Sequence, residues 1–101
     1  MSEQQDFDST HCPDHLDGAN VILWAWSGNK PFGIVADISS GEEDKIFGLA
    51  ICKYEKEENF YRFSCNNIWE VIQDGVYNSE QEAIERLPNQ YQNLKIVWKR
   101  K

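Results

Sequence analysis

The stretch KIFGLAICKYEKEENFYRFSCNNIWEVIQD, residues 45–74, decides the fold because apolar runs alternate in it with short polar connections. The runs are rich in aromatic and β-branched side chains, which favour strands, and lie at residues 45–55, 59–65 and 68–74. Charged residues 56–58 and the asparagine pair 66–67 separate these runs and are typical of turns. Because strands joined by such short connections pair antiparallel, the stretch predicts an antiparallel meander.

The connection at residues 56–58 also predicts how the first two of these strands align. A three-residue turn there puts six apolar or aromatic residues on one face of the pair: Phe47, Leu49, Ile51, Tyr61, Phe63 and Cys65. We expect this register because it buries the most apolar surface.

Two further strands are expected before the meander. NVILWAWS, residues 20–27, is apolar on both alternating sets, as in a strand that is covered on both faces. FGIVADI, residues 32–38, alternates, which predicts a half-buried strand whose apolar side comprises Phe32, Ile34, Ala36 and Ile38. The sequence SGNKP between the two runs is typical of a turn.

One short helix and one last strand are expected after the meander. In NSEQEAIERLP, Ser79 is the predicted N-cap and Glu82 completes a capping box. The apolar face of this helix comprises Ala83, Ile84 and Leu87, and the proline at position 88 ends it. LKIVWKR, residues 94–100, alternates and predicts a strand. The predicted fold class is α+β: a mainly antiparallel sheet of about five to six strands, in the order β-β-β-β-β-α-β, with one short helix packed on it.

The domain organisation follows from length and from the charge of the N-terminal segment. A chain of 101 residues is long enough for one core, so one domain is expected. Residues 1–19 contain five acids and no Lys or Arg, and only Phe7 and Leu16 are apolar enough to anchor them. We therefore expect residues 1–19 to be a flexible acidic tail, docked at most near its end, and residues 20–101 to be a single α+β domain.

Composition narrows the classes of function. The formal net charge of −7 argues against a nucleic-acid-binding protein, which needs cations to displace the counterions of phosphate, and favours docking on a basic protein. The longest apolar run, residues 21–26, is too short to span a membrane, and no signal peptide opens the chain. The three cysteines have no paired spacing, so we expect reduced thiols, no cofactor and a cytoplasmic location.

The pentad HCPDH, residues 11–15, is the densest group of potential ligands in the chain. Structural zinc sites usually need four ligands in two pairs, and no second pair is present. Cys12 is an unfavourable nucleophile because Asp14 and Asp17 place negative charge beside its thiol. We therefore expect neither a metal site nor a catalytic residue here, and a pentad that is mobile or loosely docked.

The candidate partner-binding residues are acids in two expected loops and a few aromatic residues. The acids are Glu42, Glu43 and Asp44 in one loop and Glu55, Glu57 and Glu58 in the other. An exposed aromatic anchor would supply short-range binding energy, and the candidates are Trp24, Trp26 and Tyr54. For the two tryptophans, which share a strand face with Ile22, the alternative is a role as core rings.

The segment FYRFSCNNIWEVIQDGVYNSEQEAIERL resembles the end of small bacterial immunity proteins that neutralise polymorphic or contact-dependent growth-inhibition toxins. The resemblance covers about residues 60–98 and is carried by Trp69, Asp74, Ser79, Glu82 and Ala83. It implies a compact α+β unit and an inhibitory, non-enzymatic role. It transfers no binding residue, because immunity proteins bind their toxins through surfaces that differ between pairs.

The leading prediction is therefore a non-enzymatic acidic protein-binding module, such as an immunity or inhibitor protein that occludes a basic toxin or enzyme. One alternative is a small structural or regulatory protein that self-associates through a sheet edge or the tryptophan-rich strand, so that a monomer and a homodimer both stay open. A metal-dependent enzyme that uses residues 11–15 is the least favoured reading, because its ligands lack a second half and a rigid cleft.

Overall fold

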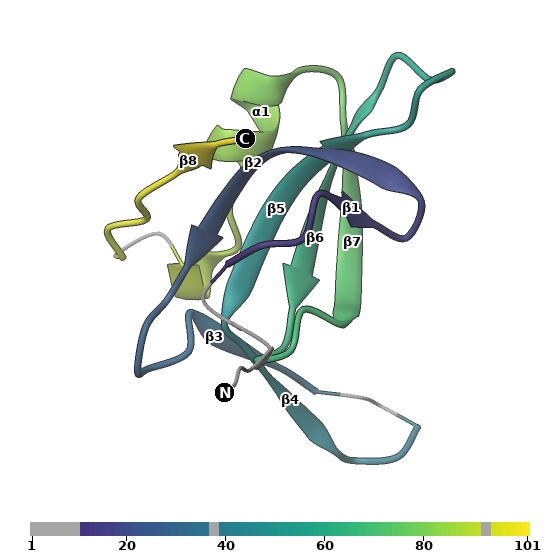
Figure 1. Ribbon diagram of the computed structural model, residues 1–101. Coiled ribbons are helices and arrows are strands. Elements are labelled where there is room, and N and C mark those ends of the chain that lie inside the picture. The colour runs from purple at the N-terminus through teal and green to yellow at the C-terminus, as the bar shows by residue number, and fades with distance from the viewer. Residues whose placement is uncertain (1–10, 37–38, 92–93) are drawn as a thin grey trace, which may run out of the picture.

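The computed structural model of the protein describes residues 11–36, 39–91 and 94–101 (Figure 1). These residues form β1 (His15–Leu16), β2 (Ala19–Trp26), β3 (Gly33–Ala36), β4 (Glu43–Ile46), β5 (Gly48–Lys53), β6 (Phe60–Cys65), β7 (Val71–Tyr77), α1 (Glu80–Glu85), the 3-10 turn η1 (Asn89–Tyr91) and β8 (Lys99–Arg100). The predicted α+β class, a mainly antiparallel sheet with one short helix, is confirmed. Within the described ranges no helix is long and apolar enough to cross a membrane.

The main sheet has the order β1-β2-β5-β6-β7, and every pair in it is antiparallel. Strand β8 pairs with the same outer edge of β2 as β1, at Leu23 and Trp24. Strands β3 and β4 form a separate two-stranded sheet, which projects from the lower end of the molecule in Figure 1. The meander predicted at residues 45–74 is therefore the centre and one edge of the main sheet.

The core has two sides, one on each face of the main sheet. The tryptophan face, as we call it, comprises Cys12, Leu16, Ala19, Val21, Trp24, Ala50, Cys52, Phe63, Cys65 and Trp69. The helix face lies under α1 and the C-terminal segment and comprises Leu23, Ala25, Phe32, Ile46, Leu49, Ile51, Ala83 and Tyr91. Burial on both sides explains why β2 and β5 are apolar on both alternating sets.

The predicted register of β5 against β6 is wrong by one residue. Ala50 lies opposite Phe63 and Cys52 opposite Tyr61, whereas Ile51 lies opposite Arg62. Since both faces of β5 are buried, the count of apolar side chains does not distinguish the two registers. The connection between the strands is also longer than expected and spans residues 54–59.

The expected strand at residues 45–55 is divided at Phe47 into two elements that belong to different sheets. Its first part, β4, pairs with β3. In β3 the two faces are the reverse of the prediction, because Ile34 is exposed while Val35 packs toward the core. The ring of Tyr91 lies so close to Gly33 that a Cβ there would be 2.4 Å from it, so this side of β3 must face inward. Ile38 lies outside the described residues.

The irregularity in β2 and the turn between β6 and β7 each differ from the prediction in one respect. A β-bulge between Val21 and Leu23 turns Ile22 to the helix face, so Ile22 does not share a face with Trp24. The asparagine turn does close the β6–β7 hairpin, and the Asn66 side chain accepts hydrogen bonds from the backbone N–H groups of residues 68 and 70. The left-handed residue of this turn is Trp69, with φ 63°, rather than an asparagine.

The predicted last strand is mostly extended chain outside the sheet. Only Lys99 and Arg100 pair, and they do so with β2. The expected alternation holds for residues 95–99, where Ile96 and Trp98 pack on the helix face while Val97 is exposed, but it is wrong at Leu94, which is exposed. Alternation therefore indicated burial for most of this segment and did not indicate strand pairing.

The helix is confirmed, with its capping box. The Ser79 hydroxyl accepts from the Glu82 N–H at 3.0 Å, and the Glu82 carboxylate accepts from the Asn78 N–H at 2.8 Å. At the other end, the buried guanidinium of Arg62 donates to the carbonyls of Ala83 and Arg86 at 2.8 and 2.7 Å. This residue of β6 therefore attaches the end of α1 to the sheet.

The structure corrects the expectation of a flexible tail for residues 11–19; residues 1–10 lie outside the described residues. Asp17 and Gly18 have φ values of 49° and 81° and form a two-residue turn that pairs β1 with β2. Cys12 is fully buried and Leu16 nearly so, both on the tryptophan face. The apolar surface of these two side chains was enough to fold an otherwise acidic segment onto the sheet.

The N-terminal segment is held to the C-terminal one by a group of contacts that we call the latch. The Lys101 ammonium donates to the Cys12 carbonyl and lies 2.9 Å from the Asp14 carboxylate. The Lys101 N–H donates to the Ile22 carbonyl at 2.9 Å. The pentad is thus part of the fold, with Cys12 in the core and Asp14 as an ion-pair partner.

We expect the latch to make stability depend on pH. The hydrogen bond from Lys101 lowers the pKa of the Asp14 carboxyl. Such a group stabilises the folded state above its unfolded pKa of about 3.9, and this contribution is lost as the pH falls through the lower folded value. Urea denaturation should therefore show a difference between wild type and Asp14→Asn at pH 7 that shrinks below about pH 4. In a Lys101→Met background, Asp14→Asn should no longer cause this pH-dependent difference in stability. If wild type and Asp14→Asn differ in stability by the same amount at pH 7 and at pH 3, the role of the ion pair is contradicted.

Candidate functional site

The structure does not bring the two predicted acid loops together. Glu42, Glu43 and Asp44 lie at the start of β4, at the lower end of the molecule in Figure 1. Glu55, Glu57 and Glu58 lie in the β5–β6 connection, at the opposite end of the main sheet. A single partner group cannot reach both loops, so the two must be considered as separate candidate surfaces.

Trp24 is a core ring rather than an exposed anchor. It is only 6 % exposed and belongs to the tryptophan face. Its ring contacts His11 edge-on at 5.4 Å, and the ammonium groups of Lys99 and Lys101 lie 5.0 and 6.0 Å from its centre. The Trp24 ring is therefore covered by His11 and by the C-terminal lysines, and little of it is open to a partner.

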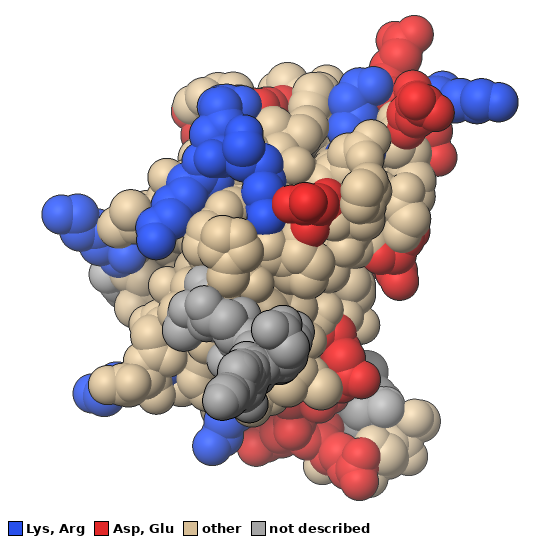
Figure 2. Space-filling model, in the orientation of Figure 1, with Lys and Arg blue, Asp and Glu red and all other residues tan. Residues whose placement is uncertain are grey.

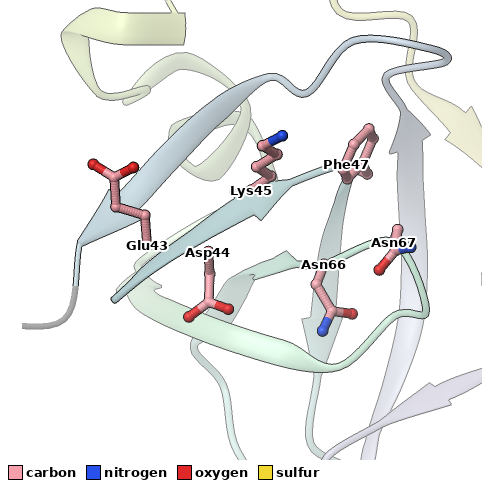
Figure 3. A pocket seen from close by; sticks show the side chains of 6 residues that line it. All are labelled: Glu43, Asp44, Lys45, Phe47, Asn66 and Asn67. Atoms are coloured by element: carbon pink, nitrogen blue, oxygen red, sulfur yellow. The ribbon is translucent and has the colours of Figure 1, made fainter. Parts of the chain in front are cut away.

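Trp26 is half-buried and stacks on Phe47 with ring centres 5.8 Å apart. Phe47 in turn lines a hollow of about 440 Å³ between β4 and the β6–β7 turn, together with Glu43, Asp44, Lys45, Asn66 and Asn67 (Figure 3). This hollow is the first candidate surface. The lining of this hollow includes one lysine as well as two acids, which lowers its net negative charge.

The second candidate surface lies at the upper end of the tryptophan face. The rings of Tyr54 and Tyr61 meet edge to face with centres 5.1 Å apart. The Tyr54 hydroxyl donates to the Asp17 carbonyl at 2.9 Å, and the Tyr61 hydroxyl donates to the Glu57 carboxylate at 2.7 Å. Both rings are half-buried, so each keeps part of its surface open to solvent.

The neighbouring edge strand extends this surface. In the β6–β7 pair, Val76 lies directly opposite Tyr61 and Asp74 opposite Phe63, so both point to the same side of the sheet as the tyrosines. Val76 is 55 % exposed. We call the whole group the tyrosine patch; it comprises Asp17, Tyr54, Glu57, Tyr61, Asp74 and Val76.

Negative charges in the tyrosine patch act on both of its tyrosines. The pKa of Tyr54 is raised by loss of solvent and by the charges of Asp17, Glu57 and Asp74. The pKa of Tyr61 is raised first by its hydrogen bond to Glu57, then by loss of solvent and by the charges of Glu57 and Asp74. Among the described residues no Lys or Arg forms an ion pair with these three carboxylates. The same negative charges that disfavour the deprotonated form of a tyrosine favour a cation bound beside it.

Sequence reasoning found only part of the tyrosine patch. Tyr54 and Glu57 were candidates, and the structure places them together. Asp17 and Asp74 were missed because they lie in segments distant from Tyr54 and Glu57 in the chain, and Tyr61, which is close to both, was missed because it was assigned to a buried strand face. The dipeptide Asp17–Gly18 was a usable signal, since Asp-Gly between apolar residues is typical of a tight hairpin and would have placed Asp17 on the sheet.

Charges on the surface are partly segregated. In Figure 2, a group of Lys and Arg lies at the upper left, over the C-terminal segment with Lys99, Arg100 and Lys101, whereas many Asp and Glu lie along the right-hand and lower margins, with basic side chains among them at the upper right. Strand β7 runs along that right-hand margin in Figure 1. A basic partner is therefore attracted to the β7 side of the molecule and repelled from the β8 side.

The pentad and the cysteines offer no metal-binding geometry in the part of the chain that the structure describes, where no three His, Cys, Asp or Glu side chains are grouped to hold an ion. All three cysteines are buried free thiols on the tryptophan face. Burial raises the pKa of the Cys12 and Cys52 thiols to about 12 and also raises that of Cys65.

We expect these thiols to be unreactive in the folded protein. At pH 8 a thiol with a pKa near 12 is almost entirely protonated, and only the thiolate is the nucleophile. Ellman's reagent should therefore label fewer than one thiol per chain in native protein over the time in which it labels all three in urea. Rapid labelling of Cys12 in native protein would contradict its burial and reopen the question of a reactive site in the pentad.

Comparison with known protein families, with curated proteins and with solved structures found no match to this chain.

Proposed function

We propose that the protein is a non-enzymatic binding module that docks on a basic protein through the tyrosine patch. The observation that carries this proposal is that three carboxylates without a cationic partner surround two half-buried tyrosine rings. Lysine or arginine side chains of a partner would enter this field, and an arginine can stack on a ring while its guanidinium meets a carboxylate. Tyrosines add large contact area at a small cost in conformational entropy.

The specific form that we propose is an immunity or inhibitor protein that acts in the cytoplasm by occluding the active site of a basic toxin or enzyme. What supports it is the net charge of −7 together with the partial segregation of acids toward one side of the molecule. Among the residues that carry the resemblance to immunity proteins, Ser79, Glu82 and Ala83 shape or seat the helix. Asp74 instead lies in the tyrosine patch, where a partner can reach it.

The tyrosine patch is preferred over the hollow beside β4 for two reasons. Lys45 lines the hollow together with its two acids, whereas the carboxylate charges that act on the two tyrosines of the tyrosine patch are those of Asp17, Glu57 and Asp74. In addition, the amide of Asn66 is already used by the turn that it closes.

The test compares two charge-matched variants of the immobilised protein in an extract of the organism that encodes it. Glu57→Gln with Asp74→Asn neutralises two acids of the tyrosine patch, and Glu43→Gln with Asp44→Asn neutralises the two acids of the hollow beside β4. We expect wild type to retain one basic protein in stoichiometric amount, in a salt-sensitive manner. The purified partner should bind the β4 variant within twofold of wild type and the patch variant at least tenfold more weakly.

Two outcomes would contradict the proposal. If the β4 variant loses the partner and the patch variant keeps it, the hollow is the binding surface. If neither variant changes binding, or if wild type retains no basic protein, charge-guided docking on this protein is wrong.

Self-association remains the second candidate function. The edge of β7, which pairs only with β6 among the described residues, is open to a second copy, but pairing over its full length would bring the two Asp74 carboxylates together. Sedimentation of wild type at increasing concentration separates the two functions. A stable dimer at micromolar concentration would favour a structural or regulatory subunit, and a monomer would favour the binding module.

A further inference from the structure

Strand β7 is the only long edge of the main sheet that no other described segment covers. The opposite edge of the sheet is β2, and β1 and β8 occupy it at either end. Strand β7 is seven residues long, Val71–Tyr77, and pairs on one side with β6. In an antiparallel strand alternate residues direct their N–H and C=O groups to opposite sides, so about half of those in β7 point outward without a partner strand.

The side chains of β7 make self-pairing unfavourable. Asp74 is the middle residue of the strand. If two copies paired over the full length of β7 in a symmetric antiparallel arrangement, the pair would be centred on Asp74 and the two Asp74 carboxylates would lie directly opposite one another. Like charges in this position destabilise a strand pair. The edge is therefore protected against a second copy of the same chain but not against a strand that carries the opposite charge.

On the tryptophan-face side, β7 presents features that select such a strand. Val76, exposed and opposite Tyr61, offers an apolar contact, and Asp74, two residues before it, offers a negative charge. Glu57 adds a second charge nearby through its contact with Tyr61. A strand with a basic residue opposite Asp74 and an apolar residue opposite Val76 would complement this edge.

We propose that an extended basic segment of the partner pairs with β7 as an additional strand of the main sheet. This inference rests on the proposed function and specifies how its surface is used. Main-chain hydrogen bonds to β7 would supply affinity, and the alternating side chains over the tyrosine patch would supply specificity. The partner segment would cover the exposed parts of Val76 and of the Tyr61 ring.

The test uses a variant of the protein itself as a basic strand of known geometry. Asp74→Lys changes the middle of β7 from acidic to basic, and Asp74 is exposed, so the variant should fold. Wild type and Asp74→Lys should each remain monomeric, because each would pair like charges. A 1:1 mixture should form a heterodimer through the two β7 edges, with an association constant at least tenfold above that of either homodimer in sedimentation equilibrium.

A control variant on β4 and a measurement of hydrogen exchange show whether the heterodimer forms through the edge of β7. Glu43→Lys makes the same change of charge on β4 and should form no heterodimer with wild type. Amide hydrogen exchange in the Asp74→Lys mixture should slow at residues 71–77 and not on β4.

The inference is wrong if the Asp74→Lys mixture associates within twofold of the homodimers, or if the Glu43→Lys mixture associates equally well. Either result leaves the proposed function standing as long as a basic partner is captured through the tyrosine patch. Heterodimer formation without capture of any basic protein would support the open edge and overturn the proposed function.

Discussion

Replacement of Arg62 by alanine is expected to lower the free energy of unfolding by about 3 kcal/mol, because it removes charge-assisted hydrogen bonds in a buried site. Arg62 is 7 % exposed, and its guanidinium donates to the carbonyls of Ala83 and Arg86. It also lies 4.8 Å from the centre of the Tyr77 ring. The alanine variant leaves two carbonyls at the end of α1 without their donor and a cavity beneath the helix. Urea denaturation followed by tryptophan fluorescence measures the loss.

Arg86→Ala is the matched control for this experiment. The Arg86 side chain is 71 % exposed and its ion pair with Glu82 is 3.7 Å long, so its removal should cost less than about 0.5 kcal/mol. The loss of stability in Arg62→Lys should lie between those of Arg62→Ala and Arg86→Ala, because a lysine ammonium can reach one of the two carbonyls but lacks the planar, forked shape of a guanidinium. An Arg62→Ala variant as stable as Arg86→Ala would show that α1 is held to the sheet by apolar packing alone.

Gly48→Ala is expected to have a similar effect for a steric reason, with a loss of about 3 kcal/mol from overpacking in the core. A Cβ at this position would lie 2.5 Å from Cζ3 and 2.6 Å from Cη2 of Trp69. The backbone cannot move away, because Gly48 is paired with Trp26 on one side and with Cys65 on the other. The Trp69 ring cannot move freely either, since it is buried and packs against both Trp24 and Trp26.

Gly28→Ala provides the comparison for Gly48→Ala. An added Cβ at Gly28 meets nothing within 4 Å, and the positive φ of 87° leaves only backbone strain, which costs about 1 to 2 kcal/mol. Trp69→Leu should restore part of the stability lost in Gly48→Ala, because it removes the clashing ring. If the stability losses of Gly48→Ala and Trp69→Leu simply add in the double variant, the close approach of Trp69 to Gly48 does not cause the destabilisation by Gly48→Ala.

The fold class was predictable because the local signals agreed with one another. The capping box at Ser79 and Glu82 is a contact between residues close in sequence, and it formed as expected. The asparagine turn and the apolar runs around it likewise specify a hairpin without help from the rest of the chain. The register of β5 was not predictable from alternation, since Leu49 and Ala50 are both fully buried, on opposite faces.

The candidate site was less predictable than the fold, because Asp17 and Asp74 join Tyr54, Glu57 and Tyr61 only through strand pairing between segments distant in the chain. Tyr54 and Asp17 are 37 positions apart and meet through a side-chain to backbone hydrogen bond. Arg62 looked like an ordinary polar position of a strand, and its role depends on carbonyls 21 and 24 positions further along. Glu43 and Asp44 were expected in a loop but lie in β4, where Asp44 is only partly exposed, and only three-dimensional placement separated them from Glu55, Glu57 and Glu58.

The latch has a consequence for the kinetics of folding. It joins Cys12 to Lys101 across 89 positions, and the entropy lost in closing so long a loop must be offset by contacts formed earlier. The hairpins β5–β6 and β6–β7 close over short separations and should form first. The pairing of β8 with the outer edge of β2 should therefore form late. In native-state hydrogen exchange, the amides of β8 should open at a lower free energy than those of β5 and β6.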